Sequence, residues 1–467
     1  MRVAWIGLLV LLLPTFASAD IKIPVIEGEW WQVAGDPDLG QYTDPKQQPV
    51  DFAVWQAADG TWQLWSCIRH TTCGGHTRLF HRWEGQRLTD TDWEPKGIAM
   101  MADPGLGEPL GGLQAPHVVQ WQGTYWMAYG DWDDICFATS EDGKEFTRII
   151  QPDGETAVFT EGPGVNTRDA MLLFTEELWY CYYTAFPNGR GYDYCRTSAD
   201  LKTWSHSSVV AYGGWAGNNP FSAECPHMVE VDPGEYYLFR TQRYGEDGQT
   251  SVYRSENPLN FGIDDDSYFV TSMPVAAPEI VLYEGQYYMA SLLPSLKGIR
   301  IAKLNWVSVE TIGMPVFDFD DTDAREEWKV VDGDIDPVFT QSTRQDFAAP
   351  MDWFIGTAEV AEGGFEDARM CVVESPSFTV VDAPYAVYIS GGARDASLHV
   401  VVADSATGEE FLRMTGRTSN RLERRIVDLS KFAGREAVVR VVDRDSEPWG
   451  HINFGGLFVL SGQGNSD

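Results

Sequence analysis

The sequence is poor in basic residues: 34 Lys and Arg stand against 69 Asp and Glu, which gives a formal net charge of −35. So few cations cannot neutralise the phosphates of a nucleic acid, and an anionic membrane surface would repel the chain. We therefore expect neither nucleic acid nor a membrane as a partner. Hydrophobic residues make up 43% of the chain, which is enough for a folded core and excludes a disordered chain.

Long apolar runs are also scarce. The run from Trp5 to Leu13 is too short to span a bilayer, and no other stretch approaches the ~20 apolar residues that a span requires. It follows Met1-Arg2 and precedes Ala17-Ser18-Ala19, a pattern typical of a secretory signal peptide with its cleavage site. We predict a signal peptide over residues 1–19 and an exported protein, secreted or periplasmic.

Cysteine is limited to seven residues, and no C-x-x-C pair is present, so a structural zinc site has no support. The number is odd, so at least one thiol is free or pairs between chains. Cys181 and Cys195 flank an expected hairpin tip and could be cross-strand partners, and Cys67 and Cys73 could close a small loop. The alternative is that these are partly buried thiols without a bond.

Helical periodicity is nearly absent, and short strands rich in Val, Tyr, Trp and Phe alternate with turn residues, which predicts an all-β protein. Five segments repeat one pattern, an apolar run, a turn and an aromatic-rich strand. Their aligned positions are Phe52, Pro116, Ala170, Pro226 and Pro278. Units of this length with about four strands are typical of propeller blades. We predict a five-bladed β-propeller over residues 20–312.

After Trp306 the pattern changes. We predict an acidic linker over residues 313–325 and a jelly-roll-type β-sandwich over residues 326–467. The carboxylates from Asp318 to Asp323 could hold a structural Ca²⁺ through oxygen ligands, with a solvated linker as the alternative. We expect no required cofactor.

Three carboxylates stand at or next to the position before the aligned column. Asp51 and Asp169 occupy that position in the first and third units, and Glu224 lies one residue earlier in the fourth. In a propeller these side chains converge on one end of the central channel, where like charges are costly unless the site uses them. Glycoside hydrolysis needs such a set, one carboxylate as nucleophile or base and one as acid. A third, ionised carboxylate would raise the pKa of the acid and stabilise positive charge on the sugar.

These motifs resemble those of the five-bladed glycoside hydrolases of families 32 and 43. Arg168-Asp169-Ala170 and Glu224-Cys225-Pro226 are similar to the Arg-Asp-Pro and Glu-Cys-Pro motifs of family 32, and Ala115-Pro116-His117 is similar to an Ala-Pro motif of family 43. The resemblance implies that Asp51 is the nucleophile or general base, Asp169 the transition-state stabiliser and Glu224 the general acid. It also implies that Arg168 holds a sugar hydroxyl.

The chain departs from the family 32 pattern at two positions. Phe52 follows Asp51 in place of the usual Asn-Asp-Pro-Asn-Gly-like motif, and Ala170 replaces a proline. Asp44-Pro45 is a rival candidate in the first unit, but it lies too far upstream of Gly60 to match the inner strand. The C-terminal residues resemble the β-sandwich that follows many family 32 propellers.

Further candidates surround the carboxylates. His117 and His227 share one column with Glu279, and they could bind sugar hydroxyls, a channel cation or one another, or be structural. Arg69 in a loop could reach the substrate. Trp55, Trp132 and Trp215 could stack on sugar rings, although most of the 18 Trp must pack between blades.

The sequence therefore predicts an exported glycosidase that hydrolyses O-glycosyl bonds of an oligo- or polysaccharide. Family 32 implies retention of configuration and fructosides, whereas family 43 implies inversion and arabinosides, xylosides or galactosides. One alternative is a non-catalytic carbohydrate-binding propeller, because one fold hosts many functions. Another is a related enzyme that uses His117 or His227 as the acid, as some anhydro-galactosidase-like families do. The oligomeric state stays open.

Overall fold

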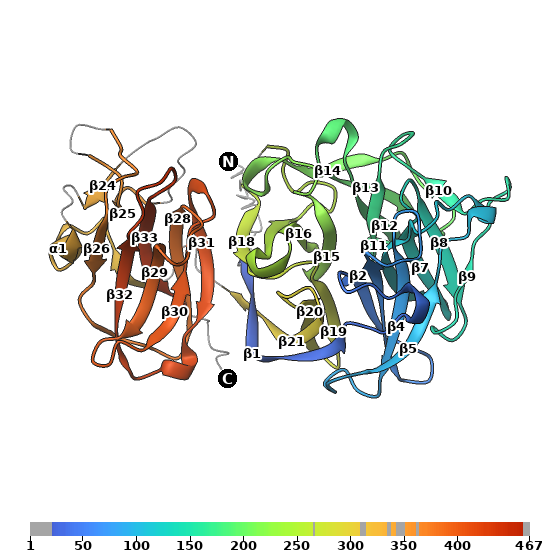
Figure 1. Cartoon of the computed structure of the whole chain (residues 1–467), viewed down its shortest axis with the longest axis horizontal. Coiled ribbons are helices and arrows are strands. Elements are labelled where there is room, and N and C mark those ends of the chain that lie inside the picture. Colours follow the sequence, from blue (N-terminus) through green and yellow to red (C-terminus); the bar gives the residue numbers. More distant parts are fainter. Residues whose placement is uncertain are drawn as a thin grey trace, which may run out of the picture.

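The computed structural model describes residues 21–264, 267–308, 314–333, 338–341, 351–360 and 364–460, and the expected signal peptide lies outside them. Two bodies lie side by side, an N-terminal body (residues 21–308) and a C-terminal body (residues 314–460) (Figure 1). Strands dominate both, so the prediction of an all-β protein is confirmed. In the described part of the chain, no helix has the length and apolar character needed to cross a membrane.

The N-terminal body contains five sheets of antiparallel strands. The first is β2 (Gln48–Gln56), β3 (Trp62–Arg69), β4 (Leu79–Gly85) and β5 (Glu94–Met100). The second is β6 (Gln114–Trp121), β7 (Thr124–Gly130), β8 (Ile135–Ser140) and β10 (Ala157–Phe159), with β9 (Thr147–Arg148) also on β8. The third is β11 (Thr167–Thr175), β12 (Leu178–Ala185), β13 (Tyr192–Ser198) and β14 (Ser208–Tyr212).

The last two sheets of this body follow the same order of strands. The fourth is β15 (Glu224–Asp232), β16 (Glu235–Arg243), β17 (Gln249–Ser255) and β18 (Phe269–Met273). The fifth is β19 (Glu279–Tyr283), β20 (Gln286–Leu292), β21 (Gly298–Ser308) and β1 (Lys22–Gly35). Because β1 pairs with β21, the fifth sheet joins the beginning of this body to its end. Short 3₁₀ turns connect strands at η1 (Gly40–Tyr42), η2 (Pro104–Leu106), η3 (Pro187–Gly189), η4 (Gly214–Ala216) and η5 (Gly245–Asp247).

The first strand of each sheet contacts the first strand of the next. The contacts run from β2 to β6, β11, β15 and β19, and β19 contacts β2 again. The five strands therefore close a ring, and residues at the same position of each strand meet inside it. This arrangement brings together side chains that are more than 200 residues apart in the sequence.

One backbone feature recurs in this ring. The residue before the aligned column has a positive φ in every unit: 39° at Asp51, 40° at Ala115, 59° at Asp169, 48° at Cys225 and 48° at Ala277. Non-glycine residues seldom adopt this left-handed conformation, and such strain is concentrated at functional sites. In four of the units it coincides with an interruption of the pairing register, which is typical of a bulge that re-aims a side chain.

Strands β2 and β12 are buried on both faces, in keeping with their near-continuous apolar sequences. Cys181 packs in a cluster with Trp126 of the second sheet, whereas Cys195 packs in another with Leu238 of the fourth. Cys181 stands opposite Arg196 in the register, so Cys195 points to the other face of the sheet. All seven cysteines are free, which confirms the alternative of thiols without a bond, and neither possible pair, Cys181–Cys195 or Cys67–Cys73, is formed.

The C-terminal body contains two sheets. One has the order β31 (Ser419–Asp428), β28 (Pro384–Gly391), β33 (Ile452–Val459), β25 (Phe354–Gly356) and β24 (Phe339–Thr340), with β22 (Met314–Asp318) also on β33. The other has the order β23 (Lys329–Gly333), β26 (Cys371–Glu374), β32 (Glu436–Asp443), β29 (Leu398–Asp404) and β30 (Glu410–Met414), with β27 (Phe378–Thr379) also on β32. A single apolar cluster takes residues from both sheets, including Val387, Phe454, Val400 and Val439. The remaining elements are α1 (Thr322–Glu326) and η6 (Ser430–Phe432).

The segment expected as an acidic linker is part of this body. Strand β22 pairs with β33, and Phe317 and Phe319 are buried in the apolar cluster. Burial of these two rings outweighs the acidic character of the segment. The carboxylate of Asp320 accepts hydrogen bonds from the backbone amides of Asp352 and Trp353, at 3.0 and 2.9 Å, so it fastens a turn.

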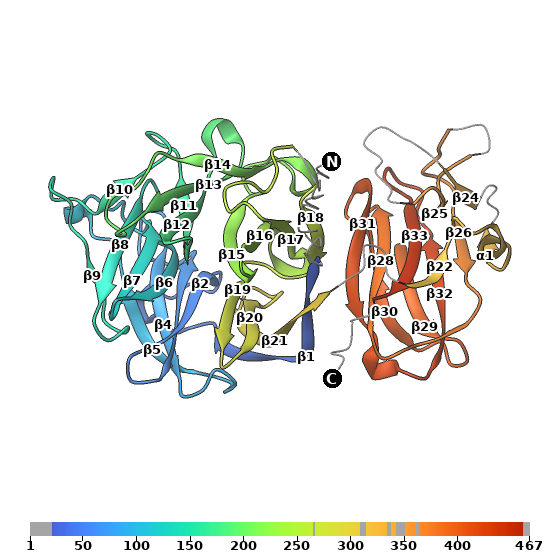
Figure 2. The ribbon, with the colours of Figure 1, turned by 180° about the vertical axis from the view of Figure 1, so that it is seen from behind.

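The two bodies contact each other through the fourth sheet. Strand β18 forms a parallel bridge to β31, between Ser272 and Arg425 (Figure 2). One apolar cluster crosses the boundary, with Phe239 and Met273 on one side and Phe354 and Phe458 on the other. Apolar burial of this kind favours a fixed relation between the bodies.

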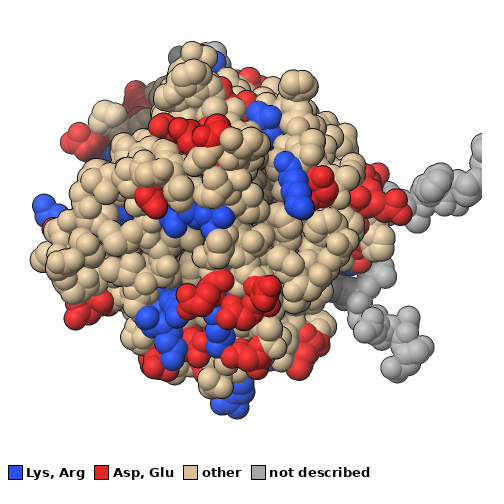
Figure 3. Space-filling model, turned by 90° about the vertical axis from the view of Figure 1, so that its right-hand side faces the viewer, with Lys and Arg blue, Asp and Glu red and all other residues tan. Residues whose placement is uncertain are grey.

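The surface carries much of the negative charge. On the face of the N-terminal body that lies furthest from the C-terminal body, Asp and Glu side chains gather with Lys and Arg among them (Figure 3). Ion pairs between neighbouring sheets offset part of the repulsion, such as Lys144 with Asp59 at 2.6 Å and with Glu84 at 2.7 Å.

A thiol count tests the cysteine assignment. Denatured protein that has never met a reductant should react with about seven equivalents of a thiol reagent, because all seven cysteines are free. The same count after reduction is the control. A rise by two equivalents or more on reduction would show a disulfide that the structure lacks.

Candidate functional site

A cavity of about 280 Å³ opens inside the ring of first strands. Its wall consists of residues at or just after the left-handed position of the five units. The lining residues are Asp51, Phe52, Ala115, Pro116, Asp169, Ala170, Met171, Cys225, Pro226, Ala277 and Glu279. The predicted carboxylates Asp51 and Asp169 are therefore brought together. The rival Asp44 lies in the turn before β2, where it accepts a hydrogen bond from the amide of Lys46.

Asp51 is buried and held by two donors. The hydroxyl of Tyr244 donates to its Oδ1 at 3.0 Å, and the thiol of Cys225 donates to the same oxygen at 3.2 Å. Burial raises the pKa of both Tyr244 and Cys225 well above their ordinary values, and the neighbouring carboxylate of Asp51 adds to this. Both groups therefore keep their protons and present them to Asp51. Nη1 of Arg78 lies 3.9 Å from the other oxygen.

Asp169 lies beside Asp51 across the Cys225 thiol. The Sγ atom and one carboxylate oxygen of each Asp all lie within 4.8 Å of one another. Oδ2 of Asp169 accepts the backbone N–H of Cys225 at 3.0 Å, while Oδ1 is buried with no hydrogen-bond partner among the described residues. Burial raises the pKa of Asp169, Arg168 opposes the rise, and the charges of Asp51 and Glu224 reinforce it.

Arg168 connects Asp169 to Glu224. Its Nη2 donates to Oε1 of Glu224 at 2.7 Å, and its Nε lies 3.6 Å from Oδ2 of Asp169. Nη1 donates to Asn166 at 2.7 Å, and the guanidinium lies over the ring of Phe186. Burial opposes the charge of Arg168, but the two carboxylates outweigh this and raise its pKa. Arg168 is 4% exposed and bonded to protein groups, and its contact with a sugar hydroxyl stays a prediction.

Glu224 itself is partly exposed, with 15% of its side chain accessible, and it is not part of the cavity wall. Its Oε1 accepts the hydrogen bond from Nη2 of Arg168. The three predicted carboxylates thus lie in one row: Asp51 lies beside Asp169, and Arg168 lies between Asp169 and Glu224.

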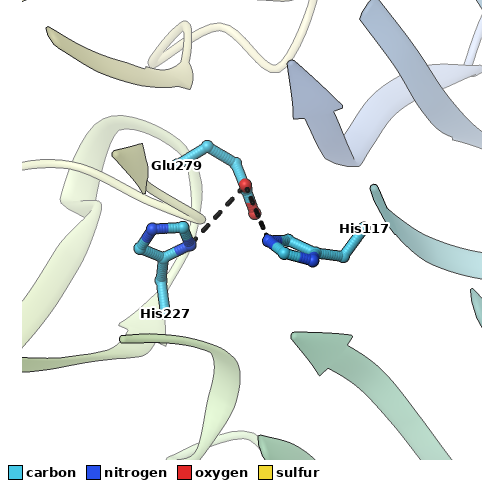
Figure 4. Close-up of side chains that lie close together, drawn as sticks. All are labelled: His117, His227 and Glu279. Atoms are coloured by element: carbon cyan, nitrogen blue, oxygen red, sulfur yellow. Dashed lines mark ion pairs between the residues drawn. The ribbon is translucent and has the colours of Figure 1, made fainter. Parts of the chain in front are cut away.

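His117, His227 and Glu279 form a second cluster in the ring, with the Glu279 carboxylate between the two imidazoles (Figure 4). The carboxylate lies 4.0 Å from Nε2 of His117 and 3.5 Å from Nδ1 of His227. The other nitrogen of each ring accepts a backbone amide, that of Leu172 or of Ile280. A neutral imidazole fixed in this way turns an N–H, and not a lone pair, toward Glu279. The donor set therefore fits contacts among the three residues better than a cation.

Two of the residues predicted to contact a sugar, Trp55 and Arg69, lie against other side chains of the protein. Trp55 is 6% exposed, donates to the carbonyl of Gly143 at 2.8 Å and packs on Phe146, which leaves no free face for a sugar. Arg69 lies with its guanidinium 5.9 Å from the centre of the Tyr244 ring, behind the group that holds Asp51.

Trp132 stacks on His76 with ring centroids 3.8 Å apart, and Arg78 lies over its ring. Of Trp215 the structure describes only the backbone.

The sequence did not point to three residues of the site, two that contact Asp51 and one that contacts Arg168. Tyr244 and Arg78 touch Asp51, and Asn166 holds Arg168. Tyr244 follows β16 and Arg78 precedes β4, so neither belongs to the repeated column. Asn166 stands two residues before Arg168, but a single polar residue in a turn carries no signal of its own.

Comparisons with known proteins give structural matches only. No protein-family model and no curated protein matches the sequence. A thermostable family-43 glycoside hydrolase is 19% identical with a TM-score of 0.42, and the match covers 58% of this chain and 93% of that chain. An endo-arabinase from Bacteroides thetaiotaomicron is 14% identical with a TM-score of 0.44, over 57% of this chain and 98% of that chain.

A third match extends over the C-terminal body. An exo-beta-1,3-galactanase from Phanerochaete chrysosporium is 12% identical with a TM-score of 0.40, over 94% of this chain and 100% of that chain. The chain is thus similar to family 43 glycoside hydrolases.

The raised pKa of Asp169 predicts a pH dependence of stability. In the folded protein the pKa of Asp169 lies above the ordinary Asp value of 3.8, so the carboxyl group keeps its proton to a higher pH than in the unfolded chain. Its contribution to stability is therefore fully present below pH 3.8. The contribution is lost as the pH rises through the folded-state pKa. The free energy of unfolding of the wild type minus that of Asp169→Asn should fall by about 1–3 kcal/mol from pH 4 toward neutrality.

Urea unfolding of both proteins at several pH values measures this difference. Asp200→Asn is the control, because hydrogen bonds from the Thr203 and Lys202 amides lower the pKa of that exposed carboxylate. A difference between wild type and Asp169→Asn that stays constant with pH would contradict the prediction.

Proposed function

We propose that the chain is a glycosidase that hydrolyses the O-glycosyl bonds of an oligo- or polysaccharide. The proposal rests on one observation: Asp51 and Asp169 lie together around the Cys225 thiol, each at the left-handed position of its strand. Glu224 is bonded to Arg168, which also faces Asp169. Paired carboxylates in one site are what glycoside hydrolysis requires. The ring of five sheets is a five-bladed propeller and the C-terminal body is a jelly-roll-type β-sandwich in this proposal.

In this proposal the surroundings of each carboxylate determine its role in the reaction. Asp51, held by Tyr244 and Cys225, acts as the nucleophile or as the base that activates water. Glu224 donates a proton from Oε2 to the leaving oxygen, while Arg168 fixes Oε1. Asp169, whose Oδ1 has no hydrogen-bond partner in the described part of the chain, stabilises positive charge on the sugar ring once it is ionised.

The substrate is a fructoside, an arabinoside or a xyloside in this proposal, since the motifs combine features of families 32 and 43. Export through the expected signal peptide, a structural Ca²⁺ and the absence of a required cofactor remain parts of the proposal. The alternative in which His117 or His227 is the acid has less support. Burial lowers the pKa of His117 to about 4, and each ring already accepts a backbone amide.

The first experiment measures sugar release from fructans, arabinans, xylans and galactans. Wild type should release sugar from one of them, and Glu224→Gln should lower kcat by about 10²- to 10⁴-fold, the usual contribution of a general acid. Glu141→Gln, an exposed residue in a turn, is the matched control and should keep full activity. Binding of a polymer without release by the wild type would favour the non-catalytic alternative.

Tyr244→Phe tests the support of Asp51. The variant keeps the ring but loses the donor to Oδ1, and hydrogen bonds to charged groups contribute about 1.5–3 kcal/mol. We expect kcat to fall about tenfold or more. Tyr212→Phe, which removes a hydroxyl bonded to Arg190 and not to a carboxylate of the site, is the control. Equal kcat values for the two variants would show that Tyr244 does not position Asp51.

A further inference from the structure

A second and larger cavity, of about 1290 Å³, lies between the two bodies. One wall comes from the end of β16, the η5 turn and β18, and the other from β30, β31 and the loop between them. It shares no lining residue with the cavity in the ring of first strands. Nothing derived above assigns a role to it.

Four arginines line this cavity, Arg243, Arg413, Arg417 and Arg425, and two of them share the buried carboxylate of Glu423. Arg417 donates from Nη1 to Glu423 at 3.0 Å and to Ser272 at 2.8 Å. Arg425 lies 3.3 Å from the other oxygen of Glu423. Arg243 makes no ion pair within 4 Å among the described residues and donates only to the backbone carbonyl of Arg417, at 3.3 Å.

Donor capacity remains in this cluster. Arg425 uses Nε on Glu423 and Nη1 on the carbonyl of Thr415, at 2.7 Å, but its Nη2 is buried without a hydrogen-bond partner among the described residues. A buried N–H without a partner is costly, and Arg425 is one of the residues that line the cavity.

The other charged groups around the cavity stand at its edge. Glu246, Asp247 and Asp395 are exposed, and Arg413 is paired with Glu410 on its own strand. The inner wall thus holds three guanidinium groups against one carboxylate. Burial lowers the pKa of Arg417 to about 9, Glu423 opposes this, and Arg425 and Arg243 add to it, so the environment disfavours the accumulated positive charge.

Apolar side chains form a large part of the remaining wall. Pro274, Leu412, Met414, Ile426 and Val427 line it. An apolar cavity at a domain boundary with a few convergent polar groups is the usual form of a small-molecule site. The planar guanidinium matches the two oxygens of a carboxylate or the oxygens of a sulfate ester.

We propose that this interdomain cavity binds an organic oxyanion, a carboxylate- or sulfate-bearing molecule such as an acidic sugar, through Arg243, Arg417 and Arg425. The anionic group supplies the missing partner of the arginines, and the body of the ligand contacts the apolar wall. Because Arg243 belongs to one body and the other two arginines to the other, a bound ligand fastens the bodies together. The proposal does not depend on hydrolysis at the ring.

The test uses the full chain and three probes: glucuronate, glucose 6-sulfate and neutral glucose. Calorimetric titration should show binding of an anionic probe at millimolar concentration or below, and glucose should not bind. The same anionic probe should raise the midpoint of thermal unfolding, since a ligand of the native state stabilises it. The preferred anion decides between a carboxylate and a sulfate ester.

Arg243→Gln should weaken the binding about tenfold or more, and it should fold because Arg243 has one hydrogen bond to the protein. Arg425→Lys is the second variant: it keeps the charge, loses the fork and should also weaken the binding. Arg435→Gln, which removes an arginine paired with Asp404 and Glu409 elsewhere on the C-terminal body, should bind as the wild type does. Failure of both anionic probes to bind, equal binding of glucose, or unchanged binding by Arg243→Gln and Arg425→Lys would overturn the proposal.

Discussion

The site depends on a backbone conformation that recurs five times. In each unit the residue directly before the aligned column has a positive φ, and the first strand of the sheet continues after it. This conformation is strained for residues other than glycine, and it persists because the closed ring of strands fixes both of its neighbours. It places the side chains of Asp51, Asp169 and Cys225 within reach of one another. Without the ring, nothing would hold these like charges together.

The electrostatics of the site follow from that enforced proximity. Two buried aspartates repel each other when both are ionised, and different hydrogen-bond donors around each one reduce the repulsion. Asp51 receives a hydroxyl and a thiol, and Asp169 receives a backbone amide and faces a guanidinium. These unequal surroundings separate the roles of two identical side chains, which is how sites with paired carboxylates assign acid and base.

The sequence predicts the site residues that occupy the repeated position of the first strands. The aligned column predicted that Asp51 and Asp169 would meet, because position in a strand repeats from unit to unit. It could not predict Tyr244 or Arg78, whose side chains reach the carboxylates from outside the column. Cys181 and Cys195 show a different limit: proximity in a hairpin says nothing of which face of the sheet each residue occupies. The acidic residues around Phe317 and Phe319 indicate a linker by composition alone, although the two rings are buried in the apolar cluster.

In the proposed reaction the Asp51 carboxylate attacks the sugar or activates the water that does. The most direct measurement is the rate of hydrolysis by Asp51→Asn on the polymer that the wild type cleaves, together with the affinity for that polymer. We expect a loss of kcat of about 10³-fold or more with binding retained, because the amide keeps the size but loses the charge. Hydrolysis by Asp51→Asn at the wild-type rate would show that the Asp51 carboxylate is not required for the reaction.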